Sequence, residues 1–305
     1  MPRVCDYEGS NYRTEFWETH QRAYEDAVER IAMEKMLPVQ GKRLIEIGAG
    51  FGRLVDLYSG YEQIILMDYA RTQLEEAQKY LGRDDRITYV VADVYNMPFA
   101  DNQFDTLVMV RVMHHLVDVP AALAEIQRII QPQGSAVIEH ASKFNLKAIF
   151  RWFLGLQQWS PFDPEPVEFV ELNFNFHPTW MRRQFEAAGL HVTKIRTLSH
   201  YRINTLKRLL PTSMLVTLDS WAQPTGKLWQ LTPSIFLQAQ AEKTASPRPA
   251  GLFRCPSCKS AALAITDQPA RADFILTCQV CRLGWQYKNG IYDFKSPVKA
   301  PDIPG

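Results

Sequence analysis

Short apolar runs alternate with amphipathic segments along most of the chain, and this alternation predicts the fold. Five runs have the length and composition of buried strands: 43–48, 63–68, 87–92, 105–110 and 136–140. Between them, apolar residues recur at helical spacing over 52–59, 71–81 and 119–130. Strands that alternate with helices form a parallel sheet with helices on both faces. We therefore predict an α/β fold built on a doubly wound, Rossmann-like sheet.

Further elements flank this alternating core. An amphipathic helix over 16–36 precedes it, and Gln131–Gly134 ends the helix before the fifth strand. Beyond that strand we expect an aromatic-rich helix over 145–159 and another helix over 178–188. Two more runs bring the predicted sheet to seven strands: 191–197 and 234–240.

The composition along the chain predicts two domains. Residues 1–244 form the α/β domain, and its first part, 1–40, is a helical cap. Insertions late in such a sheet often cover the ligand crevice and hold the substrate, and two are expected here: 145–180 and 200–226. A linker rich in Pro and Gly, 245–251, leads to a compact unit over 252–305.

Overall composition indicates an ordinary globular protein. The chain is 46% hydrophobic and 22% charged, with a formal net charge of +1. No apolar run approaches 18 residues, and the first ten residues lack the apolar core of a secretory signal. Four of the five cysteines form two Cys-x-x-Cys pairs, which is typical of metal binding in a reducing compartment, so we expect a cytoplasmic location.

A glycine-rich turn follows the first strand and predicts a cofactor site. Leu44–Gly52 carries glycines at 48, 50 and 52, and acids end the next two strands at Asp68 and Asp93. A strand, a glycine turn and an acid about 20 residues later bind adenosine-containing cofactors in doubly wound sheets. A nicotinamide or flavin site prefers G-x-G-x-x-G, but position 53 is Arg. The alternative is that these are only turn residues of the sheet.

Several motifs in order resemble the class I S-adenosylmethionine (SAM)-dependent methyltransferases, in the branch with small-molecule and quinone methyltransferases. They are Leu44–Gly52, Ile65–Asp68, Val91–Val94 and Phe104–Val108. The resemblance covers roughly residues 40–241. It implies that the glycines admit the methionine part of SAM, that Asp68 binds the ribose and that Asp93 binds the adenine. The full cofactor-binding set that it implies is Glu46, Gly48, Ala49, Gly50, Gly52, Asp68, Tyr69, Asp93, Val94 and Arg111.

Methyl transfer needs a base only if the acceptor must lose a proton. His115 is the first candidate and His140 the second, because both follow strands at the carboxyl edge of the sheet. The alternative is that neither is catalytic. Tyr7, Tyr12 and Trp17 either cover the cofactor or pack the N-terminal helix onto the sheet.

The second domain centres on four cysteines. Cys255, Cys258, Cys278 and Cys281 follow the spacing C-x2-C-x19-C-x2-C, a zinc pattern with no open ligand position, so we predict structural Zn²⁺. The unit resembles a zinc-ribbon family whose members activate methyltransferases that modify tRNA, ribosomal RNA and release factors. Trp285–Tyr287 and the C-terminal position of the ribbon depart from that family's usual pattern.

Three functions remain open at this point. The first is transfer of a methyl group from SAM to a small, apolar or aromatic molecule, favoured by the motifs and the aromatic insertions. The second is methylation of RNA or a translation factor with the ribbon as docking or activating module. The near-neutral charge counts against it, since 252–305 and its linker hold only eight Lys/Arg against four Asp/Glu. The third is a non-catalytic SAM-binding scaffold.

Overall fold

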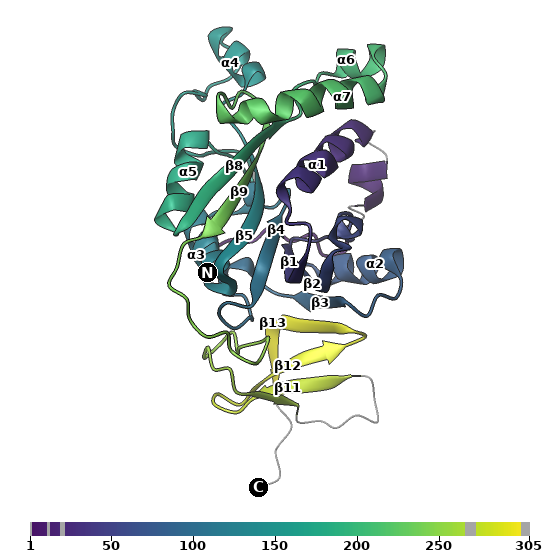
Figure 1. Cartoon of the computed structure of the whole chain (residues 1–305), viewed down its shortest axis with the longest axis vertical. Coiled ribbons are helices and arrows are strands. Elements are labelled where there is room, and N and C mark those ends of the chain that lie inside the picture. Colours follow the sequence, from purple (N-terminus) through teal and green to yellow (C-terminus); the bar gives the residue numbers. More distant parts are fainter. Residues whose placement is uncertain (1, 11–12, 19–21, 266–272, 300–305) are drawn as a thin grey trace.

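The computed structural model describes residues 2–10, 13–18, 22–265 and 273–299. Its central feature is one sheet of eleven strands in the order β10-β11-β12-β13-β3-β2-β1-β4-β5-β9-β8 (Figure 1). Seven of these strands correspond to the predicted ones: β1 (Gly41–Ile47), β2 (Tyr61–Asp68), β3 (Ile87–Val91), β4 (Phe104–Met109), β5 (Ile130–Ala141), β8 (Leu190–Leu198) and β9 (Ser234–Ala241). Strands β1 to β5 pair in parallel, and β9 runs antiparallel between β5 and β8.

Helices cover both faces of this part of the sheet, which confirms the doubly wound prediction. Successive strand residues face opposite sides, so Ile45 packs in one core cluster and Leu44 in the other. The first cluster contains the buried sides of α3 (Val119–Ile129) and α5 (Pro178–Ala187). The second contains those of α1 (Ala23–Met36), α2 (Arg71–Leu81) and α7 (Thr212–Ala222). Strand order reverses between β1 and β4, where ligands bind in such sheets.

Four predicted elements differ in extent. The helix expected over 16–36 is a π-helix, η1 (Arg13–Glu18), followed by α1 from Ala23. Where a helix was expected over 52–59, only a 3-10 turn forms, η2 (Val55–Tyr58), because Gly52 with φ +78° cannot lie in an α-helix. Helix α4 (Leu146–Phe153) is shorter than predicted and ends before Gly155 at φ +68°. Strand β5 begins at Ile130, so the expected turn at 131–134 is an irregular strand segment with Gln133 at φ +62°.

The remaining elements are short. Strands β6 (Val167–Val170) and β7 (Asn173–Asn175) form a separate hairpin. A short helix, α6 (Asn204–Leu209), precedes α7. Three 3-10 turns complete the set: η3 (Val94–Asn96), η4 (Met113–His115) and η5 (Gln223–Lys227). Among the described helices, none has the length and apolar composition needed to cross a bilayer.

The cysteine unit does not form an independent sheet. Its strands are β10 (Leu263–Ile265), β11 (Phe274–Cys278), β12 (Leu283–Lys288) and β13 (Ile291–Lys299). Ile291, Tyr292 and Asp293 of β13 pair in parallel with Tyr89, Val90 and Val91 of β3. The predicted seven-stranded sheet is therefore extended to eleven strands. The unpaired N–H and C=O groups of an edge strand favour such an addition.

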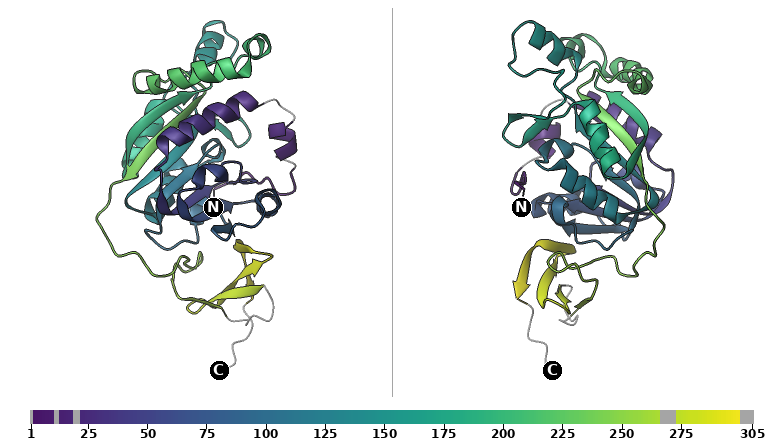
Figure 2. Two further views of the ribbon diagram at one scale, coloured as in Figure 1. Left: turned by 45° about the vertical axis from the view of Figure 1, so that its right-hand side comes forward. Right: turned by 90° about the vertical axis from the view of Figure 1, so that its left-hand side faces the viewer.

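The linker also lies against the α/β domain. The amide of Asn102 donates to Ser246 Oγ (2.6 Å), and the amide of Gln103 donates to the Pro249 carbonyl (3.1 Å). Phe253 forms a bridge with Phe99, and their rings stack 5.8 Å apart. Figures 1 and 2 show the resulting long molecule, with the cysteine unit at one end and α4, α6 and α7 at the other.

Candidate cofactor site and cysteine cluster

A cavity lies where β1, β2 and β4 end and the strand order reverses. Its walls come from the glycine turn, the ends of β2, β3 and β4, the N-terminal segment and the β6–β7 hairpin. The residues that line it are Val4, Cys5, Tyr7, Ile47, Gly48, Gly50, Met67, Asp68, Tyr69, Gln73, Ala92, Val94, Val110, Arg111, Val112, His114, His115, Leu116 and Asn173. The wall combines apolar side chains with four acidic or basic ones: Asp68, Arg111, His114 and His115.

The glycine turn is close-packed against the end of β4. Gly48 has φ +69°, and a Cβ placed on it would lie 2.1 Å from Cγ2 of Val112. Gly50 and Gly52 also have positive φ, which side chains disfavour. The turn therefore exposes its backbone to the cavity, and a larger residue at these positions would place a side chain in the space next to that backbone. This is the property that close binding of an adenosine-linked methionine requires.

Asp68 ends β2 with its carboxylate held by backbone amides. Oδ2 accepts from Gly50 N (2.8 Å), and Oδ1 accepts from Ala70 N (2.9 Å). Burial raises the pKa of Asp68, while these bonds act in the opposite direction. A carboxylate oxygen can accept more than one bond, so Asp68 can also accept from a ribose hydroxyl.

Residues 45–138 match the family model described as a methyltransferase domain. The demethylmenaquinone methyltransferase of Clavibacter sepedonicus is 30% identical over 115 residues, which are 37% of this chain and 47% of that protein. The 2-phytyl-1,4-naphtoquinone methyltransferase of Trichormus variabilis is 29% identical over 126 residues, 39% of this chain and 53% of that one. The chain thus spans about half the length of these curated relatives.

The fold has counterparts among solved structures. An S-adenosylmethionine-dependent methyltransferase from Listeria monocytogenes matches 72% of this chain and 99% of its own, with TM-score 0.51 and 15% identity. A chain from the complex between the Haloferax volcanii Trm112 methyltransferase activator and a methyltransferase matches 73% of this chain and 91% of its own, with TM-score 0.50 and 18% identity. Residues 45–138 thus match a methyltransferase domain. This match and the methyltransferases among its relatives support a SAM-dependent methyltransferase, and the solved structures show that the fold is shared.

Six of the ten residues predicted to bind the cofactor line the cavity of the methyltransferase domain: Gly48, Gly50, Asp68, Tyr69, Val94 and Arg111. Ala49 and Gly52 lie in the same turn but do not line it. Asp93 caps η3 by accepting from Tyr95 N (2.9 Å), between the lining residues Ala92 and Val94. Glu46 lies away from the cavity.

The burial of Glu46 explains its position. Its side chain is 4% exposed and faces the side of the sheet on which Tyr58 packs. Burial raises the pKa of Glu46 to about 8. Because strand residues alternate between faces, Glu46 points away from the side that Ile45 and Ile47 share. The geometry favours a structural role for Glu46 in the packing below the glycine turn.

His115 lies in the cavity and contacts the N-terminal segment. Its Nδ1 lies 2.9 Å from the Leu172 carbonyl oxygen, and its Nε2 lies 3.1 Å from the Tyr7 hydroxyl. A carbonyl only accepts, so Nδ1 carries the proton and Nε2 accepts from Tyr7. Burial lowers the pKa of His115, which keeps the ring neutral. Nε2 is therefore the basic nitrogen of the ring, and it accepts a hydrogen bond from the Tyr7 hydroxyl.

The second candidate base, His140, is not brought to the cavity. It is 1% exposed near the end of β5, and no described hydrogen-bond partner reaches its Nε2. Burial lowers the pKa of His140 to about 4. The two candidate bases are thus separated, one in the cavity wall and one in the sheet.

The sequence indicated only part of the N-terminal contribution. Tyr7 was considered as a cover, but Val4 and Cys5, which precede it, and Gln73 of α2 carried no recognisable signal. Trp17 does not line the cavity; its ring lies under the guanidinium groups of Arg53 (4.0 Å) and Arg111 (5.0 Å). Tyr12 lies outside the described residues.

The four cysteines of the second unit come together as predicted. The Sγ atoms of Cys255, Cys258, Cys278 and Cys281 all lie within 4.8 Å of one another. Cys255 and Cys281 are 3.6 Å apart, and Cys258 and Cys278 are 3.4 Å apart. Sulfurs bound to one tetrahedral Zn²⁺ at about 2.3 Å would be separated by roughly 3.8 Å. The donor set and its spacing fit zinc.

Proposed function

We propose that the protein transfers a methyl group from SAM to a small, apolar or aromatic molecule. The observation that carries this proposal is the cavity at the strand reversal, with the bare glycine turn on one side and Asp68 beside it. The apolar remainder of the wall, including Val110, Val112 and Leu116, suits an apolar acceptor. The names of two relatives, both quinone methyltransferases, support the same substrate class.

The residues of the chain would bind and orient the reactants. Bound SAM would supply an electrophilic methyl group on a sulfonium. Gly48 and Gly50 would admit its methionine part, Asp68 would accept from its ribose, and Val94 and Asp93 would meet the adenine. The N-terminal segment would exclude water by covering the cavity, since Tyr7 lies across it on His115.

His115 is proposed to accept a proton where the acceptor must lose one. Its Nε2 lone pair accepts from the Tyr7 hydroxyl at 3.1 Å, so Tyr7 would pass its own proton to Nε2 as its oxygen takes the proton of the acceptor. The Leu172 carbonyl fixes the ring by binding the other nitrogen. His140, buried outside the cavity, would act only after a rearrangement.

We further propose that the chain consists of a methyltransferase domain over 1–244, a linker over 245–251 and a zinc ribbon over 252–305. The cysteine distances support structural Zn²⁺. Thiolate coordination requires reduced cysteines, which supports a cytoplasmic location.

A second candidate function is methylation of RNA or a protein, with the ribbon as docking or activating module. One contact favours an influence of the ribbon on the site: Lys295 donates to the Tyr69 carbonyl (3.3 Å), and its Nζ lies 4.4 Å from the centre of the Tyr69 ring. Tyr69 lines the cavity. The net charge of +1 does not favour nucleic acid.

Radiolabelled SAM distinguishes these functions. Cell extract is incubated with the protein and SAM labelled on its methyl group, then separated into organic-soluble, RNA and protein fractions. We expect label in the organic-soluble fraction, and none with Asp68→Ala. Label confined to RNA or protein would establish the second function, and no label in any fraction would leave a SAM-binding scaffold.

A further inference from the structure

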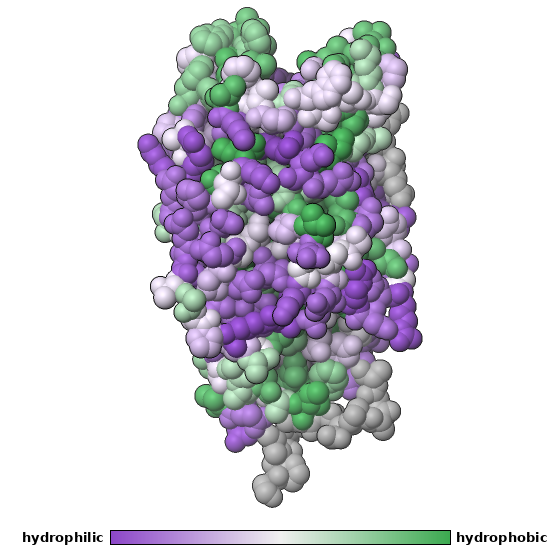
Figure 3. All heavy atoms as spheres, viewed as in Figure 1, coloured by the Kyte–Doolittle hydropathy of each residue, from purple (hydrophilic) through white to green (hydrophobic). Residues whose placement is uncertain are grey.

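The end of the molecule opposite the cysteine unit exposes an unusual number of large apolar side chains. On the α4 lobe, Phe150 is 65%, Phe153 68% and Leu154 70% exposed. On the α6–η5 lobe, Leu209 is 73%, Trp221 74% and Leu228 78% exposed. Figure 3 shows both as hydrophobic protrusions at the same end, with a hydrophilic band below them. We name these two lobes together the apolar tip.

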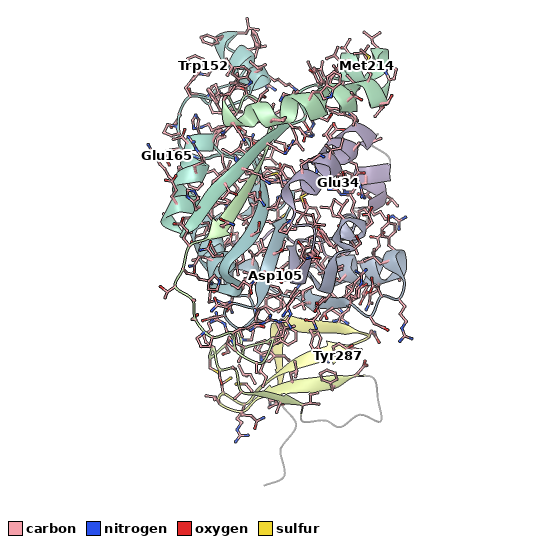
Figure 4. All side chains as sticks on the ribbon, viewed as in Figure 1. Glu34, Asp105, Trp152, Glu165, Met214 and Tyr287 are labelled. Carbon is pink, nitrogen blue, oxygen red and sulfur yellow. The ribbon has the colours of Figure 1, made fainter. Side chains whose placement is uncertain are left out.

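The two lobes are joined at their bases. The Leu146 amide that begins α4 donates to the Leu231 carbonyl (3.0 Å), close in the chain to Leu228. In Figure 4, Trp152 and Met214 mark the two lobes at the same end of the long axis. The apolar tip is therefore formed by two chain segments that protrude side by side at one end of the molecule, with a hollow between them (Figure 3).

Cations outnumber acids on the apolar tip. Over 145–163 and 200–232 the chain holds six Lys and Arg against two acids: Asp219, which is 0% exposed, and Asp163, which is exposed next to Phe162. Arg202 and Lys207 pair with Glu25, which leaves four exposed cations on these segments: Lys147, Arg151, Arg208 and Lys227. The exposed acid Glu165 lies farther from this end than Trp152 (Figure 4).

We propose that the apolar tip docks on the surface of an anionic lipid bilayer. Exposed Phe, Trp and Leu beside Lys and Arg are the composition that inserts at the level of lipid headgroups. Two protruding lobes can each enter a soft headgroup layer, whereas a folded protein partner would need a complementary surface for both. The four exposed cations outnumber the exposed acid Asp163 on these segments, and this net positive charge suits a negatively charged leaflet.

The chain connects the apolar tip to the cavity. The chain passes from α4 into the β6–β7 hairpin, whose Asn173 lines the cavity and whose preceding Leu172 binds His115. Delivery of a lipid-dissolved acceptor along this route rests on the proposed function. The docking itself rests on the surface alone.

Vesicle flotation without SAM tests the docking. Full-length protein is mixed with vesicles of phosphatidylcholine alone or with phosphatidylglycerol added. We expect binding to the anionic vesicles that weakens with salt. Phe153→Ser with Leu228→Ser should weaken it about tenfold or more, and Lys147→Gln with Arg208→Gln should weaken it roughly fivefold per charge on anionic vesicles only.

The matched control is Val39→Ser with Ile265→Ser, which removes two exposed apolar residues (92% and 51% exposed) away from the apolar tip and should leave binding unchanged. Absence of wild-type binding to anionic vesicles would overturn the proposal. So would a dimer seen by light scattering that Phe153→Ser with Leu228→Ser dissolves, since the surface would then serve self-association. Because the assay uses no SAM, its failure leaves the methyltransferase proposal standing.

Discussion

The glycine turn and the cysteine unit are both built from short motifs, but different forces fix their positions. The turn is set locally: Gly48 packs on Val112, and Asp68 binds the amide of Gly50. The position of the cysteine unit is set by distant contacts, with β13 paired to β3 and Lys295 against Tyr69. The spacing of residues along the sequence therefore indicates what a motif can bind. It does not indicate which other part of the fold the motif packs against.

Loss of the proposed zinc site in the cysteine unit should have the largest effect. Cys278→Ser removes one of the four proposed ligands, and because structural zinc supplies about 10–16 kcal/mol of folding free energy in small units, the cysteine unit should unfold. Elemental analysis should show no zinc, and hydrogen exchange should rise in β11 to β13 and in the uncovered β3. Cys5→Ser, outside the cluster, should retain the metal. Full zinc content in Cys278→Ser would contradict the assignment.

A lower pH should reduce the stability of the α/β domain, because its buried histidines become protonated when the domain unfolds. Burial lowers the pKa of His140 from about 6.5 to about 4, so the unfolded chain takes up this proton first as pH falls. The contribution is fully present above pH 6.5 and is lost between about pH 6.5 and 4, by about 3 kcal/mol in the free energy of unfolding. Denaturant titrations at several pH values should show this slope, and His140→Gln should flatten it. If the free energy of unfolding falls with pH as steeply in the variant as in the wild type, groups other than His140 govern the loss of stability in acid.

Alanine substitutions at two glycines distinguish the stability cost of close packing from the cost of backbone strain. Gly48→Ala meets Val112 at 2.1 Å and also holds φ at +69°, whereas Gly155→Ala holds φ at +68° with nothing within 4 Å. Strain alone should cost about 1–2 kcal/mol in both. Gly48→Ala should lose more stability than Gly155→Ala, and Val112→Ala should restore part of the difference. Equal losses in thermal unfolding would show that the turn is not close-packed.

Much of the sheet was predictable from the sequence because buried strands are continuous apolar runs and glycine turns have local causes. Helix α2 matches its predicted range, Arg71–Leu81. The attachment of β13 to β3 was not predictable, since Tyr89–Val91 reads like any other strand. The residues of the site were likewise only partly predictable. Gly48, Asp68 and His115 line the cavity, whereas Glu46 and His140 have suitable chemistry but point elsewhere.

The smallest expected effect tests whether the cysteine unit influences the cavity. Lys295→Gln removes the bond to the Tyr69 carbonyl and the cation above its ring. A partly exposed cation–π contact contributes about 0.5–1 kcal/mol, so SAM affinity should fall about two- to fivefold. Lys299→Gln, exposed on the same strand, is the control. If both variants bind SAM like the wild type, the ribbon does not act on the cavity through this residue.

Calorimetric titration of the purified protein with SAM, and separately with NAD, tests the central claim most directly. We predict saturable SAM binding, no NAD binding, and a loss of about ten- to a hundredfold in SAM affinity for Asp68→Ala, because a charge-assisted hydrogen bond contributes about 1.5–3 kcal/mol. Glu62→Ala, exposed on the same strand, should bind normally. NAD binding, or SAM affinity unchanged by Asp68→Ala in a protein that still melts cooperatively, would contradict the account.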